Sequence, residues 1–359
     1  MALNFENWST LTKYALLSKP TSTFFKDLLF GAETTSTTDI VMFEKQSAKD
    51  GIARFVPNNS APAKIVNKGL SSTAYSLKLP ITKEKMVFSI DEFNNYKSLG
   101  GSVMTAGASD SRVDPFSNWV LSNVDELMNR RSRRIEQMCA QAVSTGKIEV
   151  EDADGIKILI DYGFTSDQLL GQLATGSLWS ASTSNPVADI TDWAMTVAEN
   201  TGLVADTIIM GIDAWKAYAS NSTVMKYYNN LNTRIGAYDP TKIIAKGTGG
   251  QAMTQFGADK MIYVYSQKYT EDATVKDVFN SKSVLVTSSQ LAGQRWLEYV
   301  NGVITRFAKG SFNQVEQSEK LRIDILPNDE NSIVAYQLES KGAPLIKVPE
   351  GFVVAQVVA

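Results

Sequence analysis

The sequence predicts an α+β protein that combines an extended β-hairpin, one very long helix and a later α/β segment. Apolar and polar residues alternate between about residues 40 and 93, as in strands with one buried face. Apolar residues spaced by three and four then run from Phe116 to Val143, which indicates a helix. From about Ser180, helical patterns alternate with short apolar runs, which is typical of α/β units. Together these three patterns favour a mixed fold with more than one core.

Length and composition support a globular protein of about two domains. The chain has 359 residues, of which 43% are hydrophobic and 20% are charged. These fractions are ordinary for a protein with a packed core. The formal net charge is −3, so the basic excess expected of a dedicated nucleic-acid binder is absent.

Two residue types narrow the possible functions. The chain has no histidine and a single cysteine, Cys139, which excludes Ser-His-Asp and Cys-His catalysis, an internal disulfide and a zinc-thiolate cage. Cys139 falls in an apolar helical pattern and is interpreted as a small buried hydrophobe. We therefore expect no enzyme activity, no metal and no cofactor.

No segment of the sequence predicts export or a membrane span. The N-terminus has no basic stretch followed by an apolar core, and no run of about 18 apolar residues occurs. We therefore expect a protein that is made and used in the cytosol and has no contact with a membrane.

Residues 1–39 are expected to form an N-terminal arm. The arm contains one short apolar cluster, Phe24–Phe30, which Gly31 ends. The stretch from Thr34 to Thr38 is almost entirely Thr and Ser, and it is predicted to be a linker.

Residues 40–93 are predicted to form the extended β-hairpin. Pro80 cannot donate a ladder hydrogen bond, so this strand is expected at an edge or in a protruding ribbon. Between the two arms, residues 46–73 are mainly polar, and their few apolar side chains are too scattered to bury one another. The hairpin therefore needs a partner surface. The candidate contact residues are Ile52, Arg54, Phe55, Ile65 and Leu70.

The strongest helical signal runs over residues 115–146. Asp114-Pro115 supplies an N-cap and a first-turn proline, and Gly146 ends the pattern. About 31 residues at about 1.5 Å each give a rod of roughly 46 Å, so this helix should form the long axis of a flat molecule.

Four arginines form the densest charge run, and they lie within this helix. At about 100° per residue they fan around the rod, so no single face holds them all. They could contact phosphate or the acidic surface of a neighbouring subunit, or they could form a solvated helix face, and contacts between subunits are favoured. They are Arg130, Arg131, Arg133 and Arg134.

The remaining elements follow from shorter patterns. Residues 149–162 predict a small hairpin, and the tail 321–359 is mostly β. Between them we expect helices at 187–200 and 214–220 and strands at 207–212, 261–265 and 283–286.

Two stretches resemble ligand-binding motifs but are incomplete. Gly247–Gly250 lacks the Lys-Ser/Thr of a phosphate-binding loop, and Asp152–Gly155 lacks the later acidic ligands of a calcium loop. They are interpreted as a loop and a charged turn.

The order of these parts resembles the fold of tailed-phage and herpesvirus major capsid proteins. More closely, it is similar to the lambda-type family called capsid protein E. The resemblance spans nearly the whole chain and is carried by the order and spacing of four segments. These are Phe24–Phe30, Glu136–Val143, Tyr263–Tyr269 and Gly342–Ile346.

The resemblance implies a division of the chain into the parts of a capsid subunit. The hairpin would be an extended loop that lies over a neighbouring subunit, and the long helix would be the spine of a peripheral domain. The implied parts are an N-terminal arm at 1–39, the extended loop at 40–93, a peripheral domain at 94–164 and 321–359 with its spine helix at 115–146, and an axial domain at 165–320.

The resemblance also implies a function and partners. Hexamers and pentamers of one chain would close into an icosahedral head around double-stranded DNA, which the subunit would contact weakly and without sequence specificity. No long helical extension precedes the arm, so a separate scaffold protein is expected, together with a portal and a possible decoration protein.

Two other functions stay open at this point. An encapsulin-type nanocompartment shares the same fold, and an enzyme cargo in place of DNA would identify it. A histidine-free hydrolase that uses Ser-Lys or paired carboxylates is compatible with the composition, but no motif supports it.

Overall fold

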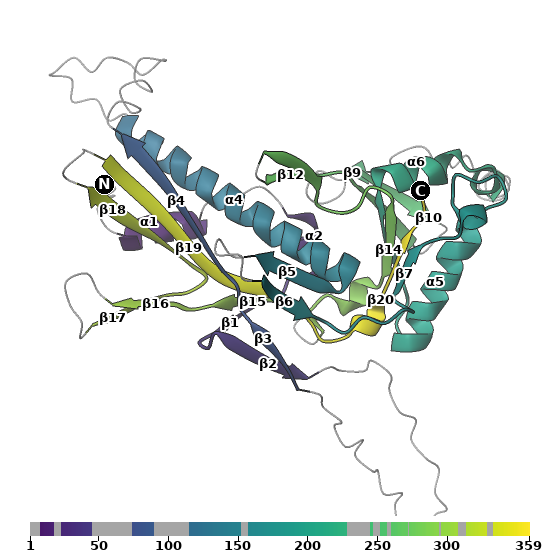
Figure 1. Ribbon diagram of the computed structural model, residues 1–359, viewed down its shortest axis with the longest axis horizontal. Coiled ribbons are helices and arrows are strands. Elements are labelled where there is room, and N and C mark those ends of the chain that lie inside the picture. Colours follow the sequence, from purple (N-terminus) through teal and green to yellow (C-terminus); the bar gives the residue numbers. More distant parts are fainter. Residues whose placement is uncertain are drawn as a thin grey trace, which may run out of the picture.

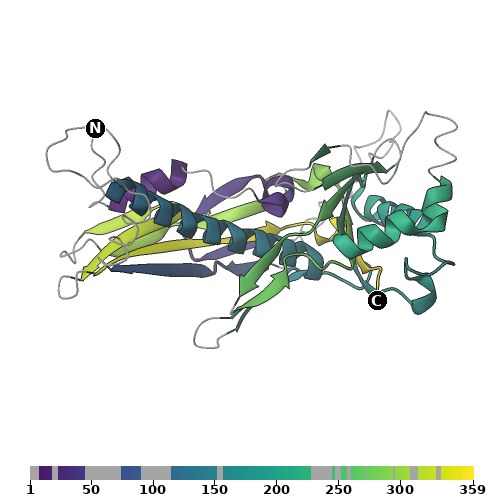
Figure 2. The ribbon, with the colours of Figure 1, turned by 90° about the horizontal axis from the view of Figure 1, so that it is seen from above.

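The computed structural model is an elongated, flat molecule in which the long helix α4 (Pro115–Thr145) runs along one half (Figures 1 and 2). The observed helix confirms the predicted one. The described residues are 8–17, 23–44, 74–89, 115–151, 157–227, 245–246, 252–256, 260–271, 273–293, 296–307, 314–328 and 333–359.

A five-stranded sheet packs against α4 and is organised around its longest strand, β19 (Ile333–Ile346). Antiparallel partners β18 (Leu321–Asn328) and β4 (Ile81–Ser89) pair with its first part, and β15 (Leu297–Gly302) pairs with its end. The fifth strand, β1 (Glu33–Ser36), is parallel to β15.

The two faces of this sheet differ because apolar and charged residues alternate along β18. Ile323 faces the core under α4 together with Leu338 of β19, whereas Arg322 and Asp324 point to the opposite face. Helix α1 (Trp8–Leu17) closes the same core at β18, where Ile323 donates its N–H to the Thr12 hydroxyl at 3.1 Å.

The other half of the molecule contains a seven-stranded sheet covered by helices α5 (Pro186–Thr201) and α6 (Ile212–Ser220) (Figure 1). Asn185 caps α5 by accepting from the Ala188 N–H at 3.3 Å, and Gly202 ends it with φ 75°. In sheet order the strands are β7 (Leu169–Gln172), β20 (Phe352–Gln356), β14 (Ser283–Thr287), β8 (Thr207–Gly211), β11 (Lys260–Tyr265), β10 (Ala252–Phe256) and β9 (Ala245–Lys246). The helices and strands predicted here are confirmed within a few residues.

The smaller elements are hairpins and single turns. The predicted hairpin after α4 is confirmed as β5 and β6, and Pro80 lies between β3 and β4 rather than inside a central strand. The hairpins are β2 (Ile40–Glu44) with β3 (Ala74–Lys78), β5 (Lys147–Glu151) with β6 (Lys157–Asp161), β12 (Lys268–Glu271) with β13 (Thr274–Asp277), and β16 (Ile304–Phe307) with β17 (Val315–Ser318). The short helices are α2 (Phe24–Leu29), η1 (Thr175–Ser177), η3 (Ser289–Leu291) and η4 (Pro349–Gly351).

Three expectations are corrected by strand pairing. Strand β20 belongs to the seven-stranded sheet, although the tail 321–359 was assigned to the other part of the chain. Conversely, β15 lies inside the range 165–320 but pairs with β19 in the five-stranded sheet. The predicted Thr/Ser linker overlaps β1, which gains hydrogen bonds from β15. Pairing partners far away in sequence decide all three, and local patterns do not reveal them.

No helix among the described ranges is long and apolar enough to span a bilayer. The segments Asp152–Gly155 and Gly247–Gly250, interpreted as a turn and a loop, lie outside the described residues.

Candidate functional site

Two of the four arginines of α4 lie on its solvent face. Arg130 Nε is 3.3 Å from Glu126 Oε1, and Arg133 Nη1 is 3.7 Å from the same oxygen. Both arginine side chains are more than half exposed, so these pairs add little to the stability of the subunit. Exchange of Glu126 for a carboxylate of another molecule would therefore cost these two arginines little free energy.

Arg134 connects α4 to the β12–β13 hairpin. Its Nη2 lies 2.9 Å from Glu271 Oε1, and Lys276 Nζ lies 2.9 Å from the other oxygen of the same carboxylate. These two cations hold the pKa of Glu271 below its usual value. The ion pair between Arg134 and Glu271 therefore holds the β12–β13 hairpin against α4.

Arg131 differs from the other three, because it lies on the inner side of α4. Burial lowers the pKa of its guanidinium, and the negative charge of the Glu33 carboxylate in the same chain opposes this effect. Its Nε has no hydrogen-bond partner within the described part of the chain. Arg131 is thus less available for a contact between subunits than the other three arginines, because a helix with residues on all sides turns one of them inward.

The five candidates in the extended hairpin, Ile52, Arg54, Phe55, Ile65 and Leu70, lie outside the described residues. The stem of that hairpin is described as β2 and β3.

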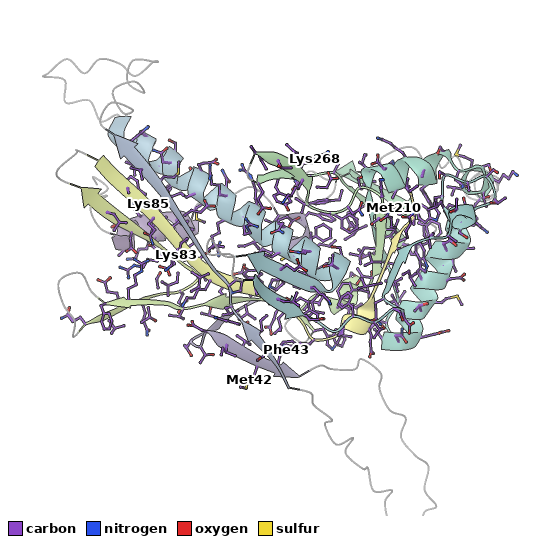
Figure 3. The ribbon with its side chains drawn as sticks, viewed as in Figure 1. Met42, Phe43, Lys83, Lys85, Met210 and Lys268 are labelled. Carbon is purple, nitrogen blue, oxygen red and sulfur yellow. The ribbon has the colours of Figure 1, made fainter. Side chains whose placement is uncertain are left out.

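On one face of the stem, Phe43 packs against the main core, while on the other Met42 is 79% exposed and Ile40 is 52% exposed (Figure 3). The stem therefore presents apolar side chains to solvent at the base of the predicted contact segment.

Glu136 is a functional residue that the sequence analysis did not single out. Its carboxylate points from α4 at the start of α2, where Oε1 accepts from the N–H groups of Phe24 at 3.0 Å and Phe25 at 2.9 Å. Oε2 accepts from the Lys26 N–H at 3.2 Å, and the Tyr265 hydroxyl donates to Oε1 at 2.9 Å. One carboxylate thereby joins the N-terminal arm, the long helix and the seven-stranded sheet.

The Glu136 side chain is almost completely shielded from solvent. The side chain is 3% exposed, and burial raises its pKa although its four hydrogen bonds favour the ionised form. Burial and the neighbouring Glu136 carboxylate also raise the pKa of Tyr265. The adjacent hollow measures about 30 Å³, which is roughly ten times smaller than a typical ligand pocket. The arrangement suits a structural joint. A polar residue between the apolar positions Ile135 and Met138 was the available sequence signal.

The face of the five-stranded sheet opposite α4 carries a network of buried charges. Arg322 is 4% exposed, and it contacts Asp324 Oδ1 at 2.7 Å through Nε and Glu316 Oε2 at 2.6 Å through Nη2. Arg306 Nη1 lies 2.9 Å from Asp324 Oδ2, and its Nη2 also contacts Glu339.

Lys83 of β4 extends this network, since its Nζ lies 3.4 Å from Glu339 Oε1 (Figure 3). The network fixes the β16–β17 hairpin, which carries Arg306 and Glu316, onto β18 and β19. The alternation of charged and apolar residues along β18 was the signal for a polar face, but the sequence does not show what covers it.

These features provide contacts rather than chemistry. In the described ranges, no group of three or more Cys, Asp or Glu residues is placed to hold a metal ion. The candidate functional surface therefore consists of the exposed β2–β3 stem, the other projecting hairpins and the exposed arginines of α4.

Comparison with known proteins identifies the fold. The chain superposes on a prophage capsid protein of E. coli CFT073 with a TM-score of 0.64, 18% identity and coverage of 100% of both chains. A phage-related protein of Bordetella bronchiseptica RB50 aligns with a TM-score of 0.54 and 9% identity, over 99% of this chain and 97% of that chain. No curated protein matches the sequence.

A family described as phage major capsid protein E matches residues 7–357, which is nearly the whole chain and includes every element described above. Members of this family build the shell of the phage particle and are not enzymes. The chain belongs to the phage major capsid protein E family.

Proposed function

We propose that this capsid protein assembles as hexamers and pentamers into an icosahedral head that encloses double-stranded DNA. The observation that carries the proposal is the family match over residues 7–357, on a chain whose exposed stems and hairpins project from two sheets. A flat subunit with projecting hairpins gains most of its contacts from neighbours in a shell.

Two bodies of the subunit take different places in this proposal. The five-stranded sheet with α4 would form the periphery of each capsomer, and the seven-stranded sheet with α5 and α6 would surround its axis. Glu136 supports such a division, because its four hydrogen bonds fix the joint at which α4 meets the seven-stranded sheet and the N-terminal arm.

The contacts between subunits are proposed to involve the extended hairpin and the outer face of α4. The described stem exposes Met42 and Ile40. Among the described residues, Arg130, Arg133 and Arg134 form ion pairs with exposed or half-buried carboxylates. Exchange of such pairs between chains would cost little, because an exposed ion pair contributes at most about 1 kcal/mol.

The partners follow from the same proposal. A separate scaffold protein, a portal and a possible decoration protein would act on the shell, which is made in the host cytoplasm and becomes part of the virion. Packaged DNA would touch the inner wall weakly, since a net charge of −3 gives little attraction for phosphate.

Assembly of the purified chain tests the proposal. With its scaffold present, the protein should form capsomers, sheets or shells that are visible by negative-stain electron microscopy. Light scattering that shows only a compact monomer with scaffold, at all concentrations and salts tried, would contradict it. DNA inside isolated particles supports a phage head, whereas an enzyme cargo would indicate a nanocompartment.

A deletion tests the assembly role of the extended hairpin. Removal of residues 50–72 should leave a soluble, folded subunit, because α4 and both sheets keep their cores. That variant should fail to close shells. Normal shells would show that the hairpin tip is dispensable.

A further inference from the structure

The β16–β17 hairpin turns its charged face toward its own subunit and its uncharged face toward solvent, which is the reverse of an ordinary surface hairpin. Its cross-strand pairs are Ile304 with Ser318, Thr305 with Gln317, Arg306 with Glu316 and Phe307 with Val315. Successive pairs point to opposite faces of the ribbon. One face therefore carries both charges, and the other carries none.

The charged face of the hairpin points toward its own subunit. Arg306 contacts Asp324 and Glu339 of the sheet, while Glu316 contacts Arg322. Because Asp324, Glu339 and Arg322 are nearly buried, loss of a partner would leave a charge with little solvation, which costs several kcal/mol. The ribbon is thus held in one orientation.

The uncharged face of the hairpin points to solvent. Phe307 is 67% exposed and Val315, directly opposite it, is 55% exposed. Thr305 and Gln317 continue this face and are exposed as well. In Figure 1 the ribbon projects from the body of the subunit beside the five-stranded sheet. An aromatic and a β-branched residue paired on an exposed ribbon gain most of their burial from another molecule.

We propose that this outward face, formed by Thr305, Phe307, Val315 and Gln317, is a contact through which one copy of the chain binds a second copy. The inference rests on the proposed assembly into a shell and adds the surface that mediates one of its contacts. The candidate contacts proposed above lie in the extended hairpin and on α4, so this surface is separate from them.

The composition of this outward face favours a second copy of the chain over packaged DNA as the molecule that covers it. Packaged DNA requires cations at the contact, and the face has none, since Arg306 is turned inward and paired. A face without charge, centred on an aromatic residue, has the composition of an interface core. The chain belongs to a family of shell proteins, so its own copies are the proteins present at highest density around the ribbon.

Thiol labelling provides a direct test. Val315→Cys places a reactive thiol on the face, and the native Cys139 does not compete because it is fully buried. Val275→Cys is the matched control, since Val275 is 62% exposed on another two-stranded hairpin, β12–β13. Each full-length variant is treated with a small maleimide, first as dissociated subunits and then as empty shells.

The expected result is that both introduced thiols react quickly in subunits. In shells, the thiol of the Val315→Cys variant should react at least about tenfold more slowly, because a buried contact opens only rarely. Unchanged labelling of that variant in shells, or equal slowing of both variants, would overturn the inference. Protection that arises only after DNA is packaged, or only after another protein binds, would assign the face to that occupant and reject the second copy.

A double variant gives an independent readout. Phe307→Ser with Val315→Thr should leave the thermal unfolding of the subunit unchanged, since both side chains are exposed, but shells should form at a critical concentration roughly tenfold higher. Normal shell formation by this variant would overturn the inference and leave the proposed function intact. A wild-type chain that never forms particles with its scaffold would instead reject the proposed function, and the contact with it.

Discussion

The Glu136 carboxylate and the Tyr265 hydroxyl lie 2.9 Å apart, although 129 residues separate them in the sequence. Phe24 and Phe25 complete the contact, since their rings pack on Tyr265 with centroid distances of 5.4 and 4.9 Å. A buried acceptor thus sits at the point where the arm, the long helix and the seven-stranded sheet meet. Substitutions at this contact should therefore lower the free energy of unfolding of the subunit and leave its exposed surface unchanged.

Glu136→Ala should destabilise the subunit by about 2–4 kcal/mol, because it leaves several buried donors without an acceptor. Chemical denaturation of dissociated subunits measures the effect, and hydrogen exchange at the amides of Phe24 to Lys26 should rise in parallel. Gln137→Ala is the control, since Gln137 is half-buried on the same helix and should cost less than about 1 kcal/mol. Equal losses in both variants would contradict the role of Glu136.

Glu33 should make the stability of the subunit depend on acid. Burial disfavours its charge, but hydrogen bonds from Lys26 and Lys320 dominate and bring its pKa to about 2. A lowered pKa in the folded state means that the stabilisation is complete above the usual value of 4.5 and is lost as the pH falls toward about 2.

Titration of unfolding between these pH values should therefore show a loss on the order of 2 kcal/mol that Glu33→Gln removes. Asp39→Asn is the comparison, because Asp39 pairs with Lys341 at 2.9 Å but is 66% exposed. Solvent screens that pair, so Asp39→Asn should change the free energy of unfolding at neutral pH by less than about 1 kcal/mol. An acid loss that persists in Glu33→Gln would assign the dependence to other groups.

Gly211 should tolerate no side chain. A Cβ at this position would lie 2.4 Å from the backbone carbonyl of Ser281, where the chain turns from β8 into α6. Gly211→Ala should therefore cost more than about 2 kcal/mol, since backbone has to move. At Gly176 an added Cβ meets nothing within 4 Å, so Gly176→Ala should change the melting temperature little. The ranking of the two melting temperatures is the measurement.

Cys139 should be unreactive in the folded subunit. The side chain is fully buried in the main core, and burial raises the pKa of its thiol well above the usual value. Ellman's reagent should label it only after unfolding, at a rate that follows the denaturant dependence of the unfolding transition. Rapid labelling without denaturant would contradict the burial of Cys139 in the free subunit.

The sequence by itself determined the elements whose signals are local. The 31-residue helix Pro115–Thr145 followed from apolar spacing and its terminal residues. The helix Pro186–Thr201 was predicted at 187–200 from its apolar face and from Gly202 beyond its end. The absence of histidine, a matter of composition alone, excluded Ser-His-Asp and Cys-His catalysis.

Only the tertiary structure decided which strands pair and which charges are buried. Thr34 and Thr35 have the pattern of a linker until β15 supplies their hydrogen bonds, and β20 joins β14, where Phe352 pairs with Thr287. Arg131 is indistinguishable in the sequence from Arg130, yet the two face opposite environments. Strand pairing depends on which segments meet in space, and the burial of one arginine among several depends on what packs against its side of the helix. Local pattern therefore decided neither.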